Sequence, residues 1–356
     1  MDFKHILITG GAGFIGSNLA VRFKESFRDC RITVLDNLKR RGSELNLPRL
    51  QSMGVQFVHG DVRSPEDFYS VSGFDCLIDC AAEPSVHAGT SGSNEYVINT
   101  NLMGTVHSLE AARRANAAFV LLSTSRVFPI ERLNNIPYRE SETRFYWDTS
   151  KSINGLDDQG ISEEFSLDGA RSFYGASKLS AELMVREYAY QWKMPAIVNR
   201  CGVLAGAWQM GSSDQGVVTH WVARHLFQKP LKYIGFGGCG KQVRDLLHVD
   251  DLFDLLVSQS ANMKKWDGQS YNIGGGRDIS VSLAELTNMC QEITGQRVPI
   301  DRVANTSEVD IRIYLTDSRK ARNDFSWKPT RDVHCILTDI SNWIGQNATL
   351  LAPILG

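Results

Sequence analysis

The sequence of 356 residues lacks the long apolar runs from which membrane-spanning helices are made. Its apolar stretches, such as residues 119–122, fall far short of the roughly 18 to 20 residues that a span requires. It also lacks an excess of either charge, because 38 Lys and Arg residues face 40 Asp and Glu residues. This balance gives no electrostatic reason to expect nucleic acid or an anionic membrane as a partner.

Cysteine is scarce and scattered. The seven thiols, at positions 30, 76, 80, 201, 239, 290 and 335, are odd in number and follow no regular spacing. Such usage is typical of reduced thiols in a cytoplasmic protein. No group of His, Cys or acidic residues has the spacing of metal ligands, so we expect no metal site. The sequence predicts a soluble, cytoplasmic globular protein.

Short apolar runs alternate with longer amphipathic stretches over the first 200 residues. The apolar runs lie at 5–9, 32–35, 56–59, 76–80, 119–123 and 196–199, and the main helical stretches at 93–116 and 172–192. This alternation is typical of βαβ units and a parallel sheet. We therefore expect a Rossmann-like, doubly wound α/β domain over residues 1–200. Residues 201–356, with helical patterns at 216–228, 250–262, 282–294 and 332–345, are expected to form a smaller, mainly helical lobe, with the chain free to cross between lobes more than once.

A glycine-rich turn follows the first apolar run. Residues 9–16 read TGGAGFIG and open a helical pattern. Gly10 permits a tight turn, Gly13 lets the backbone approach a pyrophosphate, and Gly16 lets the helix pack closely on the sheet. Unpaired N–H groups at the start of that helix, around Phe14 and Ile15, would bind the phosphates. The motif predicts a dinucleotide site.

The end of the second strand indicates which dinucleotide is bound. Asp36 lies about 20 residues after Gly16, where its carboxylate would accept the ribose hydroxyls and repel a 2′-phosphate. This position favours NAD over NADP. Lys39, Arg40 and Arg41 keep NADP open, because an arginine just beyond the strand could accommodate the phosphate.

Two further strand ends extend the predicted site. Asp61 closes the third strand in HGDVR and is placed to meet the adenine amino group. Ala81 and Ala82 end the fourth strand with small side chains, as is needed where a cofactor lies at the edge of a sheet. Residues 1–200 are therefore expected to be an NAD-binding domain.

A tyrosine and a lysine lie one helical turn apart. Tyr174 and Lys178, in YGASK, project from the same side of a predicted helix. A phenol normally titrates near ~10, but a neighbouring ammonium and a cationic nicotinamide would stabilise its phenolate and make it a base. Thr124 ends the fifth strand, and its hydroxyl can hydrogen-bond the substrate oxygen that Tyr174 deprotonates. Alone, the pair is more typical of a surface helix; the glycine turn upstream favours catalysis.

These three elements resemble the extended short-chain dehydrogenase/reductase family of NAD-dependent epimerases and dehydratases, across nearly the whole chain. The run 101–105 is similar to the family's N-x-x-G-T, in which the asparagine, here Asn101, stabilises the active-site strands. GKQVRDLLHVDD (240–251) resembles its nucleotide-diphosphate segment, with Arg244 as the diphosphate ligand, and YNIGGG (271–276) fits as well. The resemblance implies a nucleotide-diphosphate sugar bound by residues 201–356, and a homodimer or homotetramer paired through 93–116 and 172–192.

The expected site has three groups of residues. The catalytic residues are Thr124, Tyr174 and Lys178, and the substrate-binding residues are Thr124, Arg126, Gln215, Arg244 and Arg312. The residues expected to bind NAD are Gly10, Gly13, Phe14, Ile15, Gly16, Asp36, Asn37, Arg40, Asp61, Val62, Ala81, Ala82, Asn101, Tyr174, Lys178 and Cys201.

Within the family, four stretches resemble a subgroup that inverts C2 of a CDP-linked 3,6-dideoxyhexose for polysaccharide biosynthesis. They are STSRVF (123–128), ESETRF (140–145), SDQGVV (213–218) and GKQVRD (240–245). The resemblance implies that Tyr174 takes the C2 hydroxyl proton while hydride passes from C2 to NAD. The same hydride then returns to the other face of the keto sugar, so the cofactor stays bound.

Several positions depart from the family's pattern. Ser307 stands where the family often has an arginine of the phosphate clamp, three residues before Asp310, and Arg312 is the nearest substitute. Val203 and Ala205 replace an asparagine and a tyrosine of the sugar and nucleotide pocket. These changes leave the nucleotide base and the sugar open.

Other functions of the same fold remain as alternatives. A UDP-hexose 4-epimerase would use the same three catalytic residues, since the motifs do not show which carbon faces the nicotinamide. A sugar-nucleotide 4,6-dehydratase needs an acid and a base where Ser125 and Arg126 stand, and a guanidinium cannot exchange protons near neutral pH. A non-catalytic NAD-binding protein would not need Tyr174 and Lys178, and a net ketoreductase would need exchangeable NADPH, which Asp36 disfavours.

Overall fold

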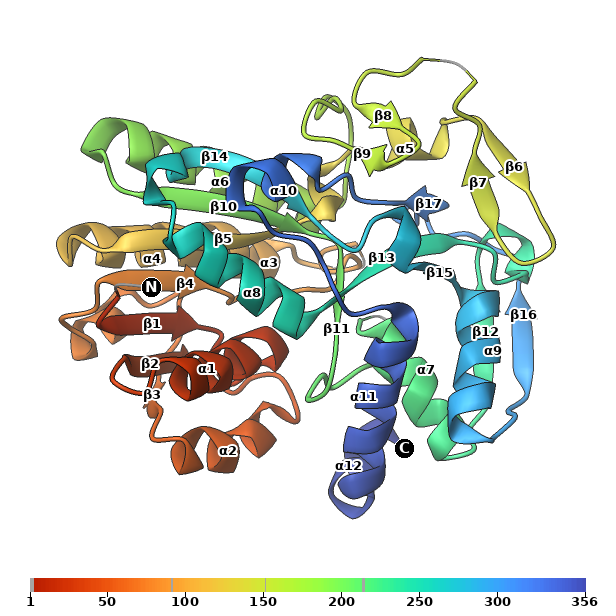
Figure 1. Ribbon diagram of the computed structural model, residues 1–356, viewed down its shortest axis with the longest axis horizontal. Helices are drawn as coiled ribbons and strands as arrows, with labels where there is room; N and C mark the ends of the chain where they lie inside the picture. Colours follow the sequence, from red (N-terminus) through yellow and green to blue (C-terminus); the bar gives the residue numbers. More distant parts are fainter. Residues whose placement is uncertain (1–2, 91, 151, 213–214) are drawn as a thin grey trace.

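A parallel sheet of seven strands forms the centre of the larger lobe, on the left of Figure 1. The computed structural model describes residues 3–90, 92–150, 152–212 and 215–356. All residues of β1 and β5 are buried, as in parallel sheets that are covered on both faces. In spatial order the strands are β14 (Asp267–Ile273), β10 (Ala196–Cys201), β5 (Ala118–Thr124), β4 (Cys76–Asp79), β1 (His5–Thr9), β2 (Arg31–Asp36) and β3 (Gln56–His59).

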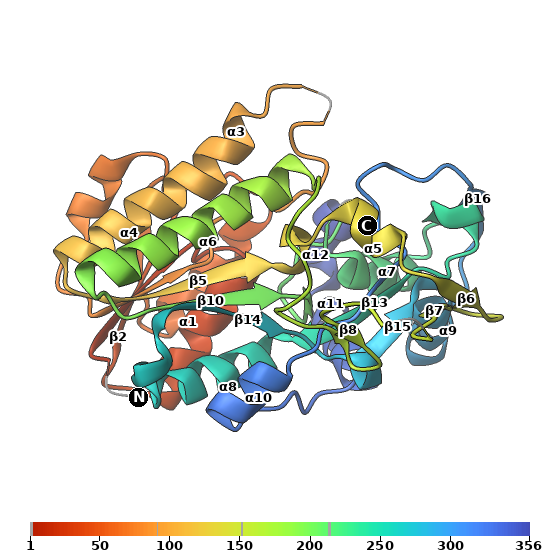
Figure 2. The same cartoon turned by 90° about the horizontal axis from the view of Figure 1, so that it is seen from above.

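Helices cover both faces of this sheet, as the alternating pattern predicts. Figure 2 shows α3, α4 and α6 over one face and α1, α8 and α10 over the other. A π-helical turn, Asn99–Met103, joins α3 to α4, so the stretch expected at 93–116 is one continuous helical rod. The doubly wound α/β fold is confirmed. The helices are α1 (Phe14–Ser26), α2 (Leu47–Ser52), α3 (Glu95–Ile98), α4 (Gly104–Arg114), α6 (Phe173–Trp192), α8 (Val249–Ser260) and α10 (Arg319–Phe325).

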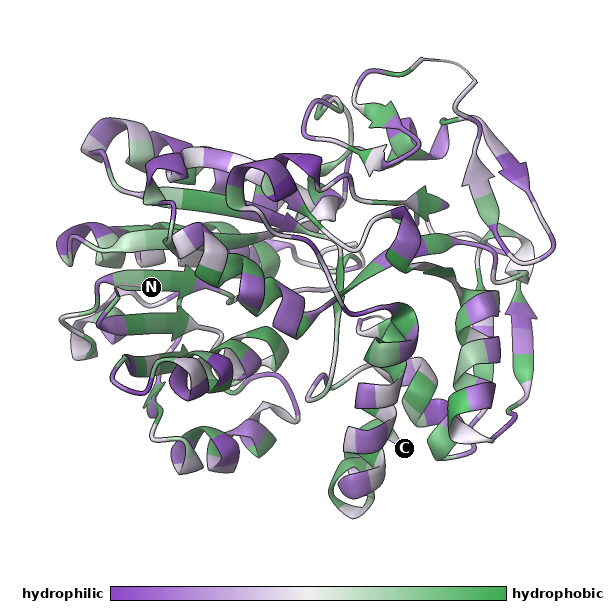
Figure 3. Ribbon diagram, in the orientation of Figure 1, coloured by the Kyte–Doolittle hydropathy of each residue, from purple (hydrophilic) through white to green (hydrophobic). Residues whose placement is uncertain are grey.

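The smaller lobe combines helices with short strands. Apolar side chains of its helices meet in a second core, and in Figure 3 these helices carry both green and purple residues, whereas the strands of the large sheet are largely green. One sheet joins β11 (Val203–Ala205), β13 (Val243–His248), β15 (Ser280–Ser282) and β17 (Ile313–Tyr314), and a parallel pair joins β12 (Leu231–Ile234) and β16 (Ile300–Val303). The helices are α7 (Val217–Leu226), α9 (Leu283–Thr294), α11 (Val333–Gln346) and α12 (Ala348–Leu355).

The polar segment 129–171 bridges the two lobes at the top right of Figure 1. Its hairpin is fastened to the smaller lobe by Arg144, whose guanidinium lies 2.7 Å from the Glu285 carboxylate at the start of α9. The segment contains α5 (Ile130–Asn134), the hairpin β6 (Tyr138–Glu140) and β7 (Phe145–Trp147), and the pair β8 (Leu156–Asp157) and β9 (Gly160–Ile161).

Residue 200 does not divide the chain cleanly between the lobes. β14 pairs in parallel with β10 at the edge of the large sheet, although it belongs to the second half of the sequence. α8 and α10 also pack on this sheet, with Phe253 and Phe325 in its core. The large sheet therefore draws its last strand and two covering helices from residues 201–356, and α8 and α10 complete the layer that α1 begins.

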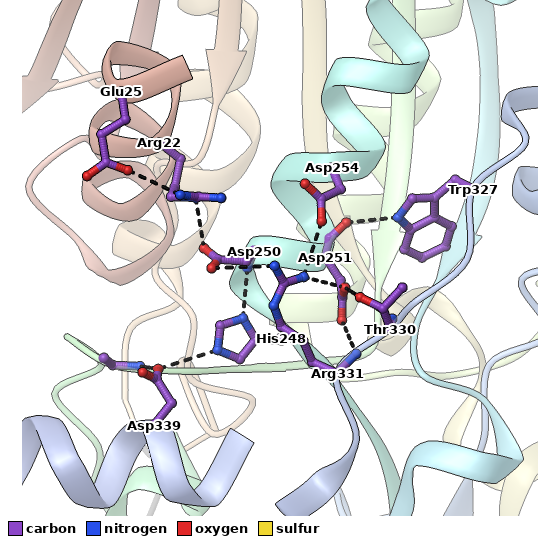
Figure 4. Close-up of polar contacts among 11 residues, drawn as sticks. Arg22, Glu25, His248, Asp250, Asp251, Asp254, Trp327, Thr330, Arg331 and Asp339 are labelled. Atoms are coloured by element: carbon purple, nitrogen blue, oxygen red, sulfur yellow. Dashed lines mark hydrogen bonds and ion pairs between the residues drawn. The ribbon is translucent and has the colours of Figure 1, made fainter. Parts of the chain in front are cut away.

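A polar network at the start of α8 holds the two lobes together (Figure 4). The Asp251 side chain is 1% exposed and accepts hydrogen bonds from the Thr330 hydroxyl, at 2.9 Å, and the Arg331 guanidinium, at 2.6 Å. His248, just before α8, lies 3.4 Å from Asp339 of α11. This network fixes where the chain leaves the large sheet and enters α11.

We predict that Asp251→Ala lowers the free energy of unfolding by about 3 kcal/mol, because it removes one partner of a buried charge pair. The control is Glu25→Ala, which removes the exposed ion pair with Arg22 at 3.2 Å and should cost less than about 1 kcal/mol. Urea denaturation followed by circular dichroism measures both. Equal losses for the two variants would contradict the central place given to Asp251.

Candidate active site

A cavity of about 1040 Å³ lies at the carboxyl ends of the sheet strands and continues into the smaller lobe. Ligands of open parallel sheets bind at this edge, and ordinary small-molecule pockets measure about 300 to 1,000 Å³. The cavity is lined by the β1–α1 turn, the ends of β2, β4, β5 and β10, the start of α6, and β13 of the smaller lobe. It has room for a dinucleotide and a second ligand together.

The glycine turn shapes the dinucleotide end of the cavity. Gly10 has φ +62°, a conformation that favours glycine, and a Cβ at Gly16 would lie 2.4 Å from the Gly10 carbonyl oxygen. A Cβ at Gly13 would approach only that same oxygen, at 3.1 Å, so the space beyond Gly13 is open to a ligand. Gly13 caps α1, whose free N–H groups and dipole face the cavity. The turn fits a pyrophosphate.

Asp36 stands at the cavity wall with its carboxylate held by the backbone. It accepts hydrogen bonds from the Ala12 N–H at 3.0 Å and the Leu38 N–H at 2.8 Å. Burial raises the pKa of Asp36, and these two N–H groups oppose that shift. Asn37 also lines the cavity. This arrangement fits the ribose of NAD.

Asp61 lies beside the cavity, between Gly60 and Val62, which both line it. Its carboxylate lies 2.6 Å from the Arg63 guanidinium and accepts a hydrogen bond from the amide of Asn37, which also lines the cavity, at 2.8 Å. These partners lower the pKa of Asp61, the Arg63 bond most of all. The expected contact of Asp61 with adenine stays a prediction.

Arg40 crosses from the Rossmann domain to the smaller lobe at the cavity. Its guanidinium donates to the Met210 carbonyl at 2.8 Å and contacts the Gln215 side-chain oxygen. Arg41 donates in the same direction, to the Pro353 carbonyl at 2.7 Å. Both guanidinia are bound to the smaller lobe, so the structure gives no support to the alternative that they hold a 2′-phosphate. Gln215 lines the cavity as expected, whereas Ser213 and Asp214 of the same stretch lie outside the described residues.

Thr124, Tyr174 and Lys178 line the same cavity. Thr124 is the last residue of β5, and its hydroxyl accepts a hydrogen bond from the Arg126 N–H at 3.2 Å. Ser172 caps α6 by accepting the Gly175 N–H at 3.2 Å, which starts the helix so that Tyr174 and Lys178 both face inward. The structure therefore brings the three residues predicted to be catalytic to one wall.

Burial is the largest influence on the pKa values of Tyr174 and Lys178. It raises the pKa of Tyr174, although the Thr124 hydroxyl and the Arg126 charge oppose the shift. Burial lowers the pKa of Lys178, opposed by Asp79 and Glu182. The sequence led us to expect that Lys178 would help to lower the pKa of Tyr174; within the protein itself, loss of solvent outweighs the nearby positive charges.

Asn101 lies behind this wall and does not line the cavity, which corrects its place among the cofactor ligands. It is fully buried in the π-helical turn. Its side chain accepts the Glu83 N–H at 2.7 Å and donates to the Ser177 hydroxyl at 3.1 Å. Asn101 therefore ties the loop after β4 to α6, because every polar atom of its amide is directed at these two segments.

Arg312 itself does not line the cavity, although Phe236, on which it packs, does. Its guanidinium lies over the Tyr138 ring at 4.0 Å and the Phe236 ring at 5.2 Å. It also donates to the Asn134 carbonyl at 3.0 Å. These aromatic and carbonyl partners hold the side chain under the β6–β7 hairpin.

The other predicted residues lie at the cavity, together with several that sequence reasoning missed. The missed residues include Glu83, Tyr96, Trp208, Phe236 and Asp310; only Glu83, directly after Ala82 at a strand end, carried a positional signal in the sequence. Cys201 lines the cavity as a neutral thiol, because burial raises its pKa to about 12. Those that lie as expected are Phe14, Ile15, Gly16, Val62, Ala81, Ala82, Arg126 and Arg244.

Three further features concern clusters of metal ligands, membrane-spanning helices and the cysteines. Across the ranges that it describes, no three His, Cys, Asp or Glu side chains gather closely enough to hold a metal ion. Within those ranges no helix combines the length and apolar character of a membrane span. Each of the seven cysteines lies in the described part of the chain and is a free thiol.

Fold and site together define a dinucleotide-binding protein of the doubly wound class. Comparison with known proteins narrows this class. The profile of the NAD dependent epimerase/dehydratase family matches residues 6–274. The chain is 33% identical to CDP-paratose 2-epimerase of Salmonella typhi, over 91% of this chain and 94% of that protein. It is 26% identical to UDP-glucose 4-epimerase of Erwinia amylovora, over 96% and 98% of the two chains.

A solved structure of similar sequence has the same fold. The dTDP-glucose 4,6-dehydratase of Bacillus anthracis, in complex with NAD, superposes with a TM-score of 0.77 at 25% identity, covering 98% of this chain and 99% of that one. The chain belongs to the NAD dependent epimerase/dehydratase family, as the sequence motifs indicate. It is therefore an enzyme, and its cofactor is NAD.

We predict that the purified protein releases NAD, and little NADP, when it is denatured, because Asp36 occupies the ribose position and Arg40 is bound elsewhere. Arg40→Ala should lower the fraction of protein that retains NAD, since it removes a bridge across the cavity. Arg41→Ala, whose guanidinium donates to the Pro353 carbonyl and does not line the cavity, is the matched control and should retain NAD. Mass spectrometry of the released nucleotide checks both. Mainly NADP, or unchanged NAD content in Arg40→Ala, would contradict this interpretation.

Proposed function

We propose that the protein is an NAD-dependent nucleotide-sugar epimerase that inverts C2 of a CDP-linked 3,6-dideoxyhexose. The observation that carries the proposal is the position of Thr124, Tyr174 and Lys178 on one wall of a cavity that spans both lobes. The 33% identity with a CDP-paratose 2-epimerase over 91% of the chain supports the choice of sugar and carbon.

Each catalytic side chain has a distinct task in this reaction. NAD, held by the glycine turn and Lys178, would supply a reversible hydride acceptor. Tyr174 takes the proton of the C2 hydroxyl as the C–H bond breaks, and returns it when the hydroxyl re-forms. Thr124 donates a hydrogen bond to the same oxygen. Lys178 holds the nicotinamide ribose and stabilises the phenolate of Tyr174.

A dehydratase needs catalytic groups that this chain lacks beside Tyr174. A dehydratase removes water and needs an additional acid and base beside the tyrosine, and Ser125 and Arg126 occupy those positions. An epimerase needs neither, because the hydride returns to the carbon that it left. The residues after Thr124 therefore favour epimerisation.

Removal of the Tyr174 hydroxyl should abolish most turnover. We expect Tyr174→Phe to lower kcat by about 10² to 10⁴, the range for loss of one general acid–base group, with NAD content unchanged. Tyr190→Phe is the matched control, because this tyrosine lies on the same helix and is 70% exposed. Steady-state rates on the CDP-sugar give the comparison. A Tyr174→Phe rate within about threefold of wild type would show that another group is the base.

Isotope labelling identifies the carbon that is inverted. A CDP-sugar with deuterium at C2 should keep its label in the product, because the transferred hydride returns to C2. Turnover should also slow if hydride transfer limits the rate. NMR of the product in ordinary water reads out both the label and the configuration. Solvent hydrogen at C2 would contradict hydride transfer, and inversion at C4 with C2 untouched would favour the UDP-hexose 4-epimerase alternative.

We further propose that two copies pair through α4 and α6, which lie side by side in Figure 2. Met103, Phe173 and Leu183 on this surface are 39%, 44% and 52% exposed, and a second copy would cover them. Leu183→Glu should convert a dimer or tetramer to a smaller species in sedimentation. Leu350→Glu, on α12 at 48% exposure, should not. A wild-type monomer would contradict the proposal.

A further inference from the structure

Two arginines from different lobes converge on one short segment of the cavity. Arg126 follows β5 in the large lobe, and Arg244 lies on β13 of the smaller lobe. The Arg126 guanidinium donates to the Val309 carbonyl at 3.0 Å, and the Arg244 guanidinium donates to the Ile311 carbonyl at 2.6 Å. Both side chains line the cavity, as does Asp310 between the two carbonyls. The segment 309–311 thus holds the two guanidinia facing the same space.

This pair of positive charges is incompletely balanced. Among the residues that the structure describes, no carboxylate forms an ion pair with either guanidinium, and the Asp310 charge acts on both from a distance. Burial lowers the pKa of Arg244 to about 9, and the Arg126 charge adds to that shift. Two guanidinia that repel each other away from bulk water form a site for an anion with more than one negative charge.

A third arginine nearby, Arg312, does not face the cavity with Arg126 and Arg244. Arg312 is held by aromatic rings and the Asn134 carbonyl outside the cavity, and Ser307 has no charge to offer. An anion between the lobes therefore meets Arg126 and Arg244.

We propose that Arg126 is the second arm of a diphosphate clamp, binding the sugar-side phosphate while Arg244 binds the nucleoside-side phosphate. The inference rests on the proposed nucleotide-sugar function and adds a specificity residue to it. It assigns to Arg126 the charge that the chain lacks at position 307.

The backbone around Arg126 gives the order of the two phosphates. Arg126 donates its N–H to the Thr124 hydroxyl, and a Cβ at Gly175, next to Tyr174, would lie 2.2 Å from the Arg126 carbonyl oxygen. Arg126 therefore belongs to the reacting end of the cavity, beside the sugar. Arg244 lies across the cavity, on β13 of the smaller lobe, and we assign the nucleoside side to it. A grip on the sugar-side phosphate anchors the substrate while the keto sugar turns over.

Binding of product-like nucleotides tests the clamp without turnover. Calorimetric titrations of the NAD-loaded enzyme would use CDP, UDP and dTDP, followed by the monophosphate of whichever base binds best. Arg126→Ala should weaken the diphosphate about ten- to a hundredfold, the usual loss for one charged hydrogen bond, and leave the monophosphate unchanged. Arg312→Ala is the matched control and should bind both like wild type. Arg126→Lys keeps the positive charge but not the planar guanidinium, so it should lose less diphosphate affinity than Arg126→Ala.

The outcomes separate this inference from the proposed function. Diphosphate affinity in Arg126→Ala within about twofold of wild type, or an equal loss for the monophosphate, would overturn the assignment of Arg126. So would an equal loss in Arg312→Ala. A preference for UDP, or inversion at C4, would overturn the CDP-sugar proposal and leave the clamp standing. A wild-type enzyme that binds none of the three diphosphates would overturn both.

Discussion

The close approach of α6 to the turn after β5 is the constraint on which the site depends. A side chain at Gly175 would place a Cβ 2.2 Å from the Arg126 carbonyl oxygen, so only glycine allows the two segments to touch. This contact sets the distance between the strand that carries Thr124 and the helix that carries Tyr174 and Lys178. It also directs the Arg126 side chain toward the cavity. One backbone contact therefore places Thr124, Tyr174 and Arg126 together at the cavity.

The second requirement is a fixed junction between the lobes. The large sheet supplies the glycine turn and the catalytic wall, whereas Arg244 and Gln215 come from the smaller lobe. The ion pair of Asp251 and Arg331 stabilises the chain where it crosses from one lobe to the other. At the cavity, Arg40 adds a hydrogen bond to the Met210 carbonyl. Because residues from both lobes line the cavity, the proposed epimerisation requires a junction that keeps the two lobes in place while the sugar turns.

Sequence reasoning found the parts of this site that depend on local geometry. The glycine turn, the strand-end Thr124 and the Tyr174–Lys178 pair follow from fixed spacings along one strand or one helix, and the structure places all of them at the cavity. It says nothing about which tertiary partners a side chain takes. Asp61 forms an ion pair with Arg63, and the Arg312 guanidinium packs on aromatic rings. The Asn101 side chain forms hydrogen bonds with Glu83 and Ser177. Spacing along the chain cannot rank such partners, and it likewise gave no sign that β14 would complete the large sheet.

In the proposed reaction, hydride leaves and returns within a single turnover, on a cofactor that stays in place. This can be tested by rapid mixing of the NAD-loaded enzyme with excess CDP-sugar, followed by the near-ultraviolet absorbance of reduced nicotinamide. We expect a signal that rises within the first turnover to a partial level and stays there while product forms, because each reduced nicotinamide returns its hydride to the bound keto sugar. Reduced cofactor that accumulates in step with product, or turnover by enzyme stripped of NAD, would show that the hydride does not return in this way.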